Sequence, residues 1–194
     1  MSQSISASLA PAAATPWLRR AVIVIAASAF VAVCSHVALP LYFTPVPLTL
    51  GPFAVLVLGL VLSPRMAASA LVAYLAEGAA GLPVFAPGPM GAAGLAHLLG
   101  PTAGYLVAYP FAAALISVLW RGSSRRPWAA LPCAAAGNLL ILACGAVWLA
   151  VFTHASAQTV FAIGVMPFLA ADALKVGAAA ALAVGLQRLS RRAR

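Results

Sequence analysis

Acidic residues are almost absent from this sequence: Asp and Glu together number two, against eleven Lys and Arg, in 194 residues. The two are Glu77 and Asp172, which leaves little for paired-carboxylate catalysis. The sequence contains no G-x-x-x-x-G-K-[ST], H-E-x-x-H or G-x-S-x-G pattern. A P-loop nucleotide site, a zincin metal site and a hydrolase nucleophile elbow are therefore excluded. We expect a protein that is not an enzyme.

Cysteine and histidine are scarce as well, with three residues of each. Cys34, Cys133 and Cys144 lie in apolar runs without C-x-x-C spacing, and the histidines are far apart in the sequence. These patterns are typical of packing cysteines and interfacial histidines. We expect neither a bound metal nor a cofactor.

Apolar residues, in contrast, make up 64% of the chain, and the mean hydropathy is +1.07. A soluble domain of this length could not bury so much apolar surface. Continuous apolar runs such as residues 21–27 also exclude an outer-membrane barrel, whose strands alternate apolar and polar residues. The fold class predicted is therefore all-α: a polytopic membrane protein with about six transmembrane helices of roughly 20 residues each.

Proline, glycine and arginine divide the chain into three predicted parts. Residues 1–18, rich in Ala, Ser and Pro, are expected to be disordered, residues 19–190 to form the six-helix domain, and residues 191–194 a basic tail. The helices are predicted at 21–37, up to 62, and at 66–81, 105–120, 131–151 and 167–186, with a loop at 152–166. Segment 82–104 is rich in Gly and Pro but uncharged, which favours a lid folded back on the helices.

The distribution of arginine predicts the topology. All ten arginines lie between or beyond the apolar runs, whereas segments 39–50, 82–104 and 152–166 contain neither Lys nor Arg. The positive-inside rule then places both termini in the cytoplasm and makes the chain a multi-pass protein of the cytoplasmic (inner) membrane. This pattern does not fit a phosphate-binding groove, so nucleic acid is not an expected partner.

The last predicted helix contains Asp172 and Lys175, the only lysine of the chain. At spacing i, i+3 they share one helix face and can reach each other. They would lie roughly 8 and 12 Å below Pro167, inside the apolar layer, where ionisable groups usually face a bundle interior or a cavity. The pair either sets helix packing alone or forms a polar binding site for a small molecule.

Five segments carry a family resemblance, and they occur in this order: TPVPLTLGPFAVLVLGLVLSPR (44–65), EGAAGLPVFA (77–86), LLGPTAGYL (98–106), GNLLIL (137–142) and PFLAADALK (167–175). Together they closely resemble BioY, the biotin-binding S component of energy-coupling factor (ECF) transporters, over about residues 20–188. The chain departs from the family pattern at Gly51, where a glutamine is usual, and at Ala103, where a glycine is usual. Pro87 and Pro89 also interrupt the small residues expected in the lid.

The resemblance implies a six-helix S-component fold that binds one biotin near the outer face. It further implies assembly with a transmembrane coupling subunit and two cytoplasmic ATPases. Ser28 and Ala32, a small-xxx-small pair on the first helix, would help to contact the coupling subunit. The family also includes members without dedicated partners, so the presence of partners stays open at this point.

The polar residues of the last two helices suit the ureido ring of biotin, which offers two N–H donors and a polarised carbonyl. Asp172 can accept from an N–H, and Lys175 or the amide of Asn138 can donate to the carbonyl. Asn138 could equally serve only helix packing, and which end of biotin Lys175 meets is open. Four aromatic residues either line the apolar part of the ligand or serve only as anchors at the membrane interface: Tyr42, Phe43, Tyr74 and Phe85.

Two other functions compete with biotin uptake. One is an S component for another vitamin, such as thiamine or riboflavin, which would share the fold but not these motifs. The other is a stand-alone proton-coupled carrier of small molecules that uses Asp172 as its relay, because one or two intramembrane acids suffice for that role.

Overall fold

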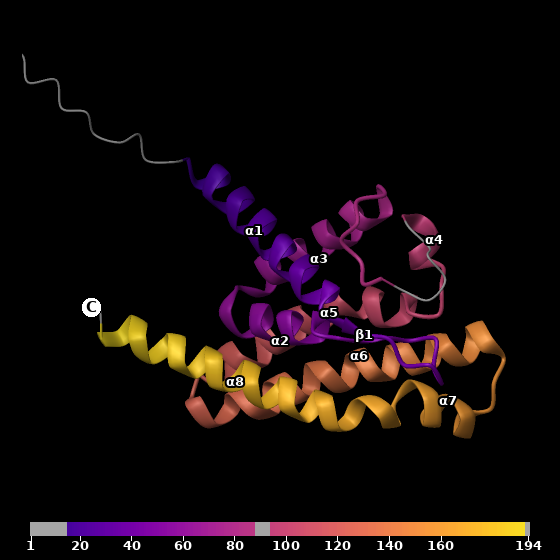
Figure 1. The fold of residues 1–194 in the computed structure, drawn as a ribbon. Helices are drawn as coiled ribbons and strands as arrows, with labels where there is room; N and C mark the ends of the chain where they lie inside the picture. Colours follow the sequence, from indigo (N-terminus) through magenta and orange to yellow (C-terminus); the bar gives the residue numbers. More distant parts are fainter. Residues whose placement is uncertain (1–14, 88–93, 193–194) are drawn as a thin grey trace, which may run out of the picture.

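The part of the chain that the structure describes, residues 15–87 and 94–192 of a computed structural model, is mainly α-helical (Figure 1). Its helices and strands are α1 (Pro16–His36), β1 (Ala38–Leu39), β2 (Leu48–Thr49), α2 (Gly51–Val61), α3 (Pro64–Ala79), α4 (Leu95–Leu98), α5 (Ala103–Gly122), α6 (Ala130–Thr153), α7 (Ala157–Gly164) and α8 (Leu169–Arg192). Single 3-10 turns at Pro127–Ala129 and Met166–Phe168 precede α6 and α8.

Proline in the first turn marks the start of the first three helices, at Pro16, Pro52 and Pro64. That turn has no intrahelical partner for its N–H groups, so a residue that lacks one fits there without loss. The six predicted helices correspond to α1, α2, α3, α5, α6 and α8, with ends that differ from the predicted ones by a few residues.

Four stretches are long and apolar enough to cross a membrane: α1, α5, Pro127–Thr153 with α6, and Ala157–Arg192 with α8. The 11 residues of α2 and the 16 of α3 are shorter than the roughly 20 that a perpendicular span needs. The described residues therefore confirm a largely helical protein with four candidate membrane-spanning helices, and the count of six spans stays a prediction.

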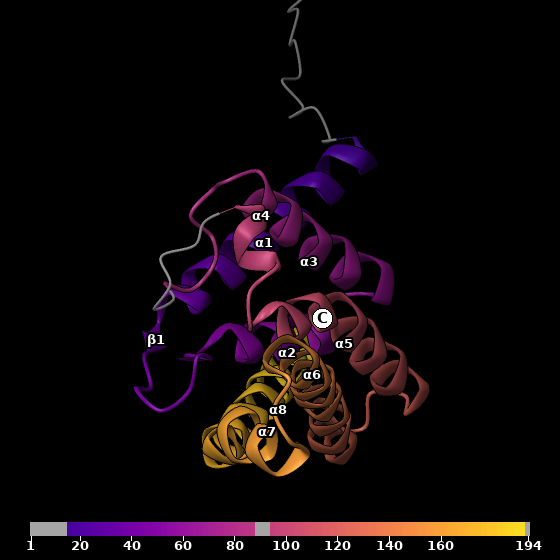
Figure 2. The ribbon, with the colours of Figure 1, turned by 90° about the vertical axis from the view of Figure 1, so that its right-hand side faces the viewer.

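The helices pack in three layers, which Figure 2 shows end-on. Helices α1 and α3 form one outer layer, α2 and α5 the middle layer, and α6 and α8 the other outer layer. Helix α5 packs against α2, α3 and α6, and it approaches α6 closely where a Cβ on Gly145 would overlap the ring of Tyr105. Small residues at such positions let two helix backbones come near each other.

The connections contain structure that the sequence did not predict. Between α1 and α2 the chain forms a short antiparallel ribbon in which Ala38 pairs with Thr49 and Leu39 with Leu48. The loop predicted at 152–166 is wrong in its middle, because α7 lies there. The side chain of Ser156 caps α7 by accepting a hydrogen bond from the N–H of Thr159 at 3.3 Å.

The structure describes only parts of the predicted terminal and lid segments. Helix α1 begins at Pro16, so the last residues of the predicted disordered segment are helical, and residues 1–14 lie outside the described ones. Likewise α8 continues to Arg192, inside the predicted tail, and residues 193–194 are not described. Segment 82–104 holds α4 and the start of α5, while its residues 88–93, Pro89 included, lie outside the described part.

Candidate functional site

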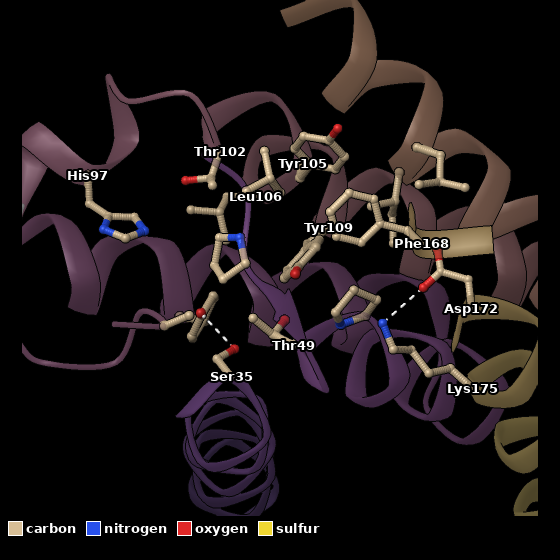
Figure 3. A pocket seen from close by; sticks show the side chains of 17 residues that line it. Ser35, Thr49, His97, Thr102, Tyr105, Leu106, Tyr109, Phe168, Asp172 and Lys175 are labelled. Atoms are coloured by element: carbon tan, nitrogen blue, oxygen red, sulfur yellow. Dashed lines mark hydrogen bonds and ion pairs between the residues drawn. The ribbon is translucent and has the colours of Figure 1, made fainter. Parts of the chain in front are cut away.

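One cavity is lined by side chains from all three layers. It lies between the C-terminal halves of α1 and α3, the ribbon, the N-terminal halves of α5 and α8, and the middle of α6. Its walls are mainly apolar, its volume is about 60 Å³, and Figure 3 shows its lining side chains. The helix ends that carry the arginines lie away from it, so the cavity belongs to the arginine-free end of the molecule.

Asp172 and Lys175 form the polar end of this cavity (Figure 3). The Nζ atom of Lys175 donates to Oδ1 of Asp172 at 2.9 Å, and both side chains are at most 7% exposed. The contact predicted from their i, i+3 spacing is thereby confirmed. Asp172 also lies in the first turn of α8, where the partial positive charge of the helix N-terminus favours a carboxylate.

Asn138 holds Asp172 from the side that faces away from the cavity. Its Nδ2 donates to the second carboxylate oxygen of Asp172, Oδ2, at 3.1 Å, and the residue is buried on α6 without lining the cavity. Both oxygens of Asp172 therefore accept a hydrogen bond from the protein. Lys175 retains two further N–H donors, since one of its three is used.

A cluster of hydroxyl groups forms a second polar wall, around Gly51. The hydroxyl of Tyr74 donates to Oγ of Ser35 at 3.0 Å, and Thr49 and Tyr109 line the cavity beside them. A Cβ added to Gly51 would lie 2.9 Å from Ser35 Oγ and 3.0 Å from the Tyr109 hydroxyl oxygen. The glycine at this departure from the family pattern thus leaves the space in which the hydroxyls converge. We call Ser35, Thr49, Tyr74 and Tyr109 the hydroxyl cluster.

Tyr105 and Phe168 close the cavity on the side of α7. The Tyr105 hydroxyl donates to the carbonyl of Gly164 at 2.6 Å, and its ring lies 6.4 Å from that of Phe168. Sequence reasoning missed these two residues and most of the hydroxyl cluster. Thr49, Tyr105 and Phe168 do lie within the motifs that carry the family resemblance, so the motifs were the signal that could have found them.

The four predicted aromatic residues lie in different places. Tyr74 lines the cavity, and Phe85 lies behind it, edge-on to Tyr74 at 5.4 Å and stacked on His97 at 4.9 Å. Tyr42 and Phe43 are 102% and 64% exposed and line a separate shallow hollow at the tip of the ribbon. The structure therefore does not bring these two residues to the cavity.

Ser28 and Ala32 lie on the side of α1 that faces the protein. Ser28 is fully buried and donates a hydrogen bond to Oε2 of Glu77 on α3, while Ala32 packs against the apolar core. Another subunit could reach the Ser28 side chain only if α1 separated from α3. Here the small-residue pair brings two helices of the same chain together.

Comparison with known proteins gives a consistent result. The family model described as the BioY family matches residues 2–192. The chain is 41% identical to a probable biotin transporter BioY of Pyrococcus horikoshii, over 74% of this chain and 82% of the relative. It is 33% identical to the biotin transporter BioY of Thermotoga maritima, over 84% of this chain and 92% of the relative.

Among solved structures, the fold is similar to that of the S-component for biotin from an ECF-type ABC transporter. The TM-score is 0.80 at 24% sequence identity, and the match covers 91% of this chain and 95% of the other. At that identity the likeness establishes the shared arrangement of helices, and the residues of the cavity must be argued from their own chemistry.

Proposed function

The chain belongs to the BioY family, and on that premise we propose that it is the high-affinity biotin-binding subunit of a transporter that takes up biotin across the cytoplasmic membrane. It binds and releases its ligand unchanged, as a transport subunit and not as an enzyme, and it needs no cofactor. The observation that carries the proposal is the buried Asp172–Lys175 pair at one end of a mainly apolar cavity.

The pair suits the ureido ring because that ring presents donors and an acceptor side by side. Each carboxylate oxygen of Asp172 has a lone pair left after its protein contact and can accept an N–H. The free N–H groups of Lys175 can donate to the ureido carbonyl. Such charge-assisted bonds are worth about 1.5–3 kcal/mol each. The neutral bicyclic part of biotin, with its one polar edge, therefore matches the Asp172–Lys175 end of the cavity.

The carboxylate of the biotin side chain belongs at the hydroxyl cluster. It would be repelled by Asp172, and no arginine lines the cavity. Hydroxyl groups, in contrast, can turn to donate to a carboxylate. We assign Ser35, Thr49 and Tyr109 to this end, and Lys175 to the ureido end.

A vitamin must enlarge the cavity to enter it. The volume of about 60 Å³ is well below the roughly 300–1,000 Å³ of sites for ligands of this size. Ala86, His97 and Thr102 line it from the segment before α5, and Val46 and Pro47 from the ribbon. These connections move more easily than packed helices, so we assign the opening to them.

The proposal includes the membrane topology of the chain and the subunits with which it assembles. We place both termini in the cytoplasm and count six spans, with α2 and α3 as the two short ones, because the arginines of the chain then lie on one side. With no P-loop in the sequence, energy comes from a transmembrane coupling subunit and cytoplasmic ATPases. The structural relative, which is the S-component for biotin from an ECF-type ABC transporter, supports these partners.

Calorimetry with the purified full-length protein tests the ligand. We expect tight binding of biotin, weaker binding of biotin methyl ester, which lacks the charge for the hydroxyl cluster, and no binding of thiamine or riboflavin. Asp172→Asn should weaken biotin binding, whereas Glu77→Gln, the same change at the other acid and outside the cavity, should leave it intact. Binding of riboflavin or thiamine in place of biotin would overturn the assignment. An equal loss of biotin affinity in Asp172→Asn and Glu77→Gln would show that Asp172 has no specific role in binding.

A further inference from the structure

An amphipathic groove lies at the end of the molecule opposite the cavity, between the last turns of α2, α5 and α8. It has two parts, of about 220 and 260 Å³, which share Arg125, Gln187 and Ser190 and are therefore continuous. The first part is otherwise lined by apolar side chains: Leu60, Val61, Trp120, Ala183 and Leu186. The second part adds Ser124 and Arg191. We call the whole the arginine groove.

Among the described residues, no carboxylate pairs with the arginines at this end. The chain has two acidic residues in all. Asp172 pairs with Lys175 in the cavity, and Glu77 accepts a hydrogen bond from Ser28. Arg125 is nevertheless half-buried in the groove wall. Because a guanidinium in such a place favours an anionic oxygen, the counter-charge must come from outside the chain.

The wall of the groove is held in a fixed shape. Ser124 and Arg125 have φ values of +54° and +53°, a left-handed conformation that is uncommon for residues other than glycine. The carbonyl of Arg125 accepts a hydrogen bond from Nε2 of Gln187 at 3.1 Å, which ties this turn to α8.

We propose that the arginine groove binds one anionic phospholipid. The phosphate contacts Arg125 and Arg191, and an acyl chain lies along the apolar part between α2 and α8. Basic pockets between transmembrane helices on the cytoplasmic side bind such headgroups through the same contacts.

The apolar half of the groove distinguishes a lipid from other anions. A free phosphate ester could satisfy Arg125 but would leave the surface beside Trp120 and Leu186 exposed. An acidic segment of a partner protein would have to reach this surface between the ends of helices that are long and apolar enough to cross a membrane. A molecule with both a phosphate and a hydrocarbon chain fits both parts.

Native mass spectrometry of the intact, delipidated protein tests the proposal. We expect phosphatidylglycerol to bind more tightly than phosphatidylcholine with the same acyl chains. Arg125→Gln should weaken phosphatidylglycerol binding about fivefold, the effect of one basic residue at a membrane surface, and Arg191→Gln should act in the same direction. Arg125→Gln keeps the backbone carbonyl that Gln187 binds. Arg188→Gln, which also removes one charge but lies outside the groove, is the matched control and should change nothing.

Four results would overturn the proposal. Equal affinity for phosphatidylglycerol and phosphatidylcholine would show that the groove does not select an anionic headgroup. An equal loss of phosphatidylglycerol affinity in Arg125→Gln and Arg188→Gln would show that the lipid is attracted by net charge and has no specific site in the groove. Displacement of phosphatidylglycerol by equimolar glycerol 1-phosphate would make the groove a site for soluble anions. If Arg125→Gln abolished assembly with a protein partner but left lipid binding unchanged, the groove would belong to that partner.

Discussion

Removing the charge of Asp172 alone should damage the protein differently from removing the charges of Asp172 and Lys175 together. In Asp172→Asn the ammonium group of Lys175 stays in a place that is 6% exposed and loses the only carboxylate within 4 Å among the described residues. In the double variant Asp172→Asn with Lys175→Met, no charge is left in the cavity. The comparison separates the packing role of the pair from its ligand role.

The magnitudes follow from burial. An uncompensated buried charge costs about 3–5 kcal/mol of stability, whereas replacing both partners by neutral residues is often close to neutral. We therefore expect the single variant to lose about 3 kcal/mol and the double variant to recover most of it. Biotin binding should not recover. Loss of one charge-assisted hydrogen bond of about 1.5–3 kcal/mol weakens binding roughly 10- to 100-fold, and the double variant loses both such contacts.

The assay is unfolding in mild detergent together with biotin calorimetry on the same preparations. Glu77→Gln is the control for removing an acid elsewhere. A double variant that regains stability and also binds biotin like the wild type would return the pair to a packing role. A single variant as stable as the wild type would refute the argument that Lys175 depends on this carboxylate.

Three further predictions rest on single contacts. Gly51→Ala should weaken biotin binding about tenfold, since its Cβ displaces the hydroxyl cluster, whereas Gly177→Ala, with open space around its Cβ, should not. Tyr105→Phe should lower stability by about 1–3 kcal/mol by leaving a buried carbonyl unpaired, and unchanged unfolding would refute this. Ser28→Leu should destabilise the protein by separating α1 from α3, whereas the exposed Ala29→Leu should be tolerated, both measured by thermal unfolding.

The sequence predicted well what depends on neighbouring residues. The contact between Asp172 and Lys175 followed from their spacing on one helix, and the helix positions followed from apolar runs bounded by proline and arginine. These signals are local, because three or four residues of helix fix which side chains meet. Whether the pair binds a ligand does not follow from local spacing, and this role stays a prediction.

The missed parts depend on contacts between distant segments. Ser35 and Tyr74 are 39 positions apart, and nothing in either neighbourhood marks them as partners. Helix α7 is only eight residues long, with a polar first turn, so its pattern resembles a loop. Tyr42 and Phe43 were linked to the ligand because aromatic residues are common in such sites. The ribbon turns them outward, and only its pairing register reveals that.

The arrangement around Asp172 also bears on why the cavity holds a pair and not a single charge. Its two oxygens already accept from Lys175 and Asn138, so the cost of burying the carboxylate is offset within the fold before a ligand arrives. A neutral ureido ring then adds its own bonds without transferring net charge into the apolar layer. A lone carboxylate there would favour a cation or a proton, and a lone lysine would favour an anion. A neutral pair whose groups still have donors and acceptors to spare selects a ligand edge that is polar and uncharged.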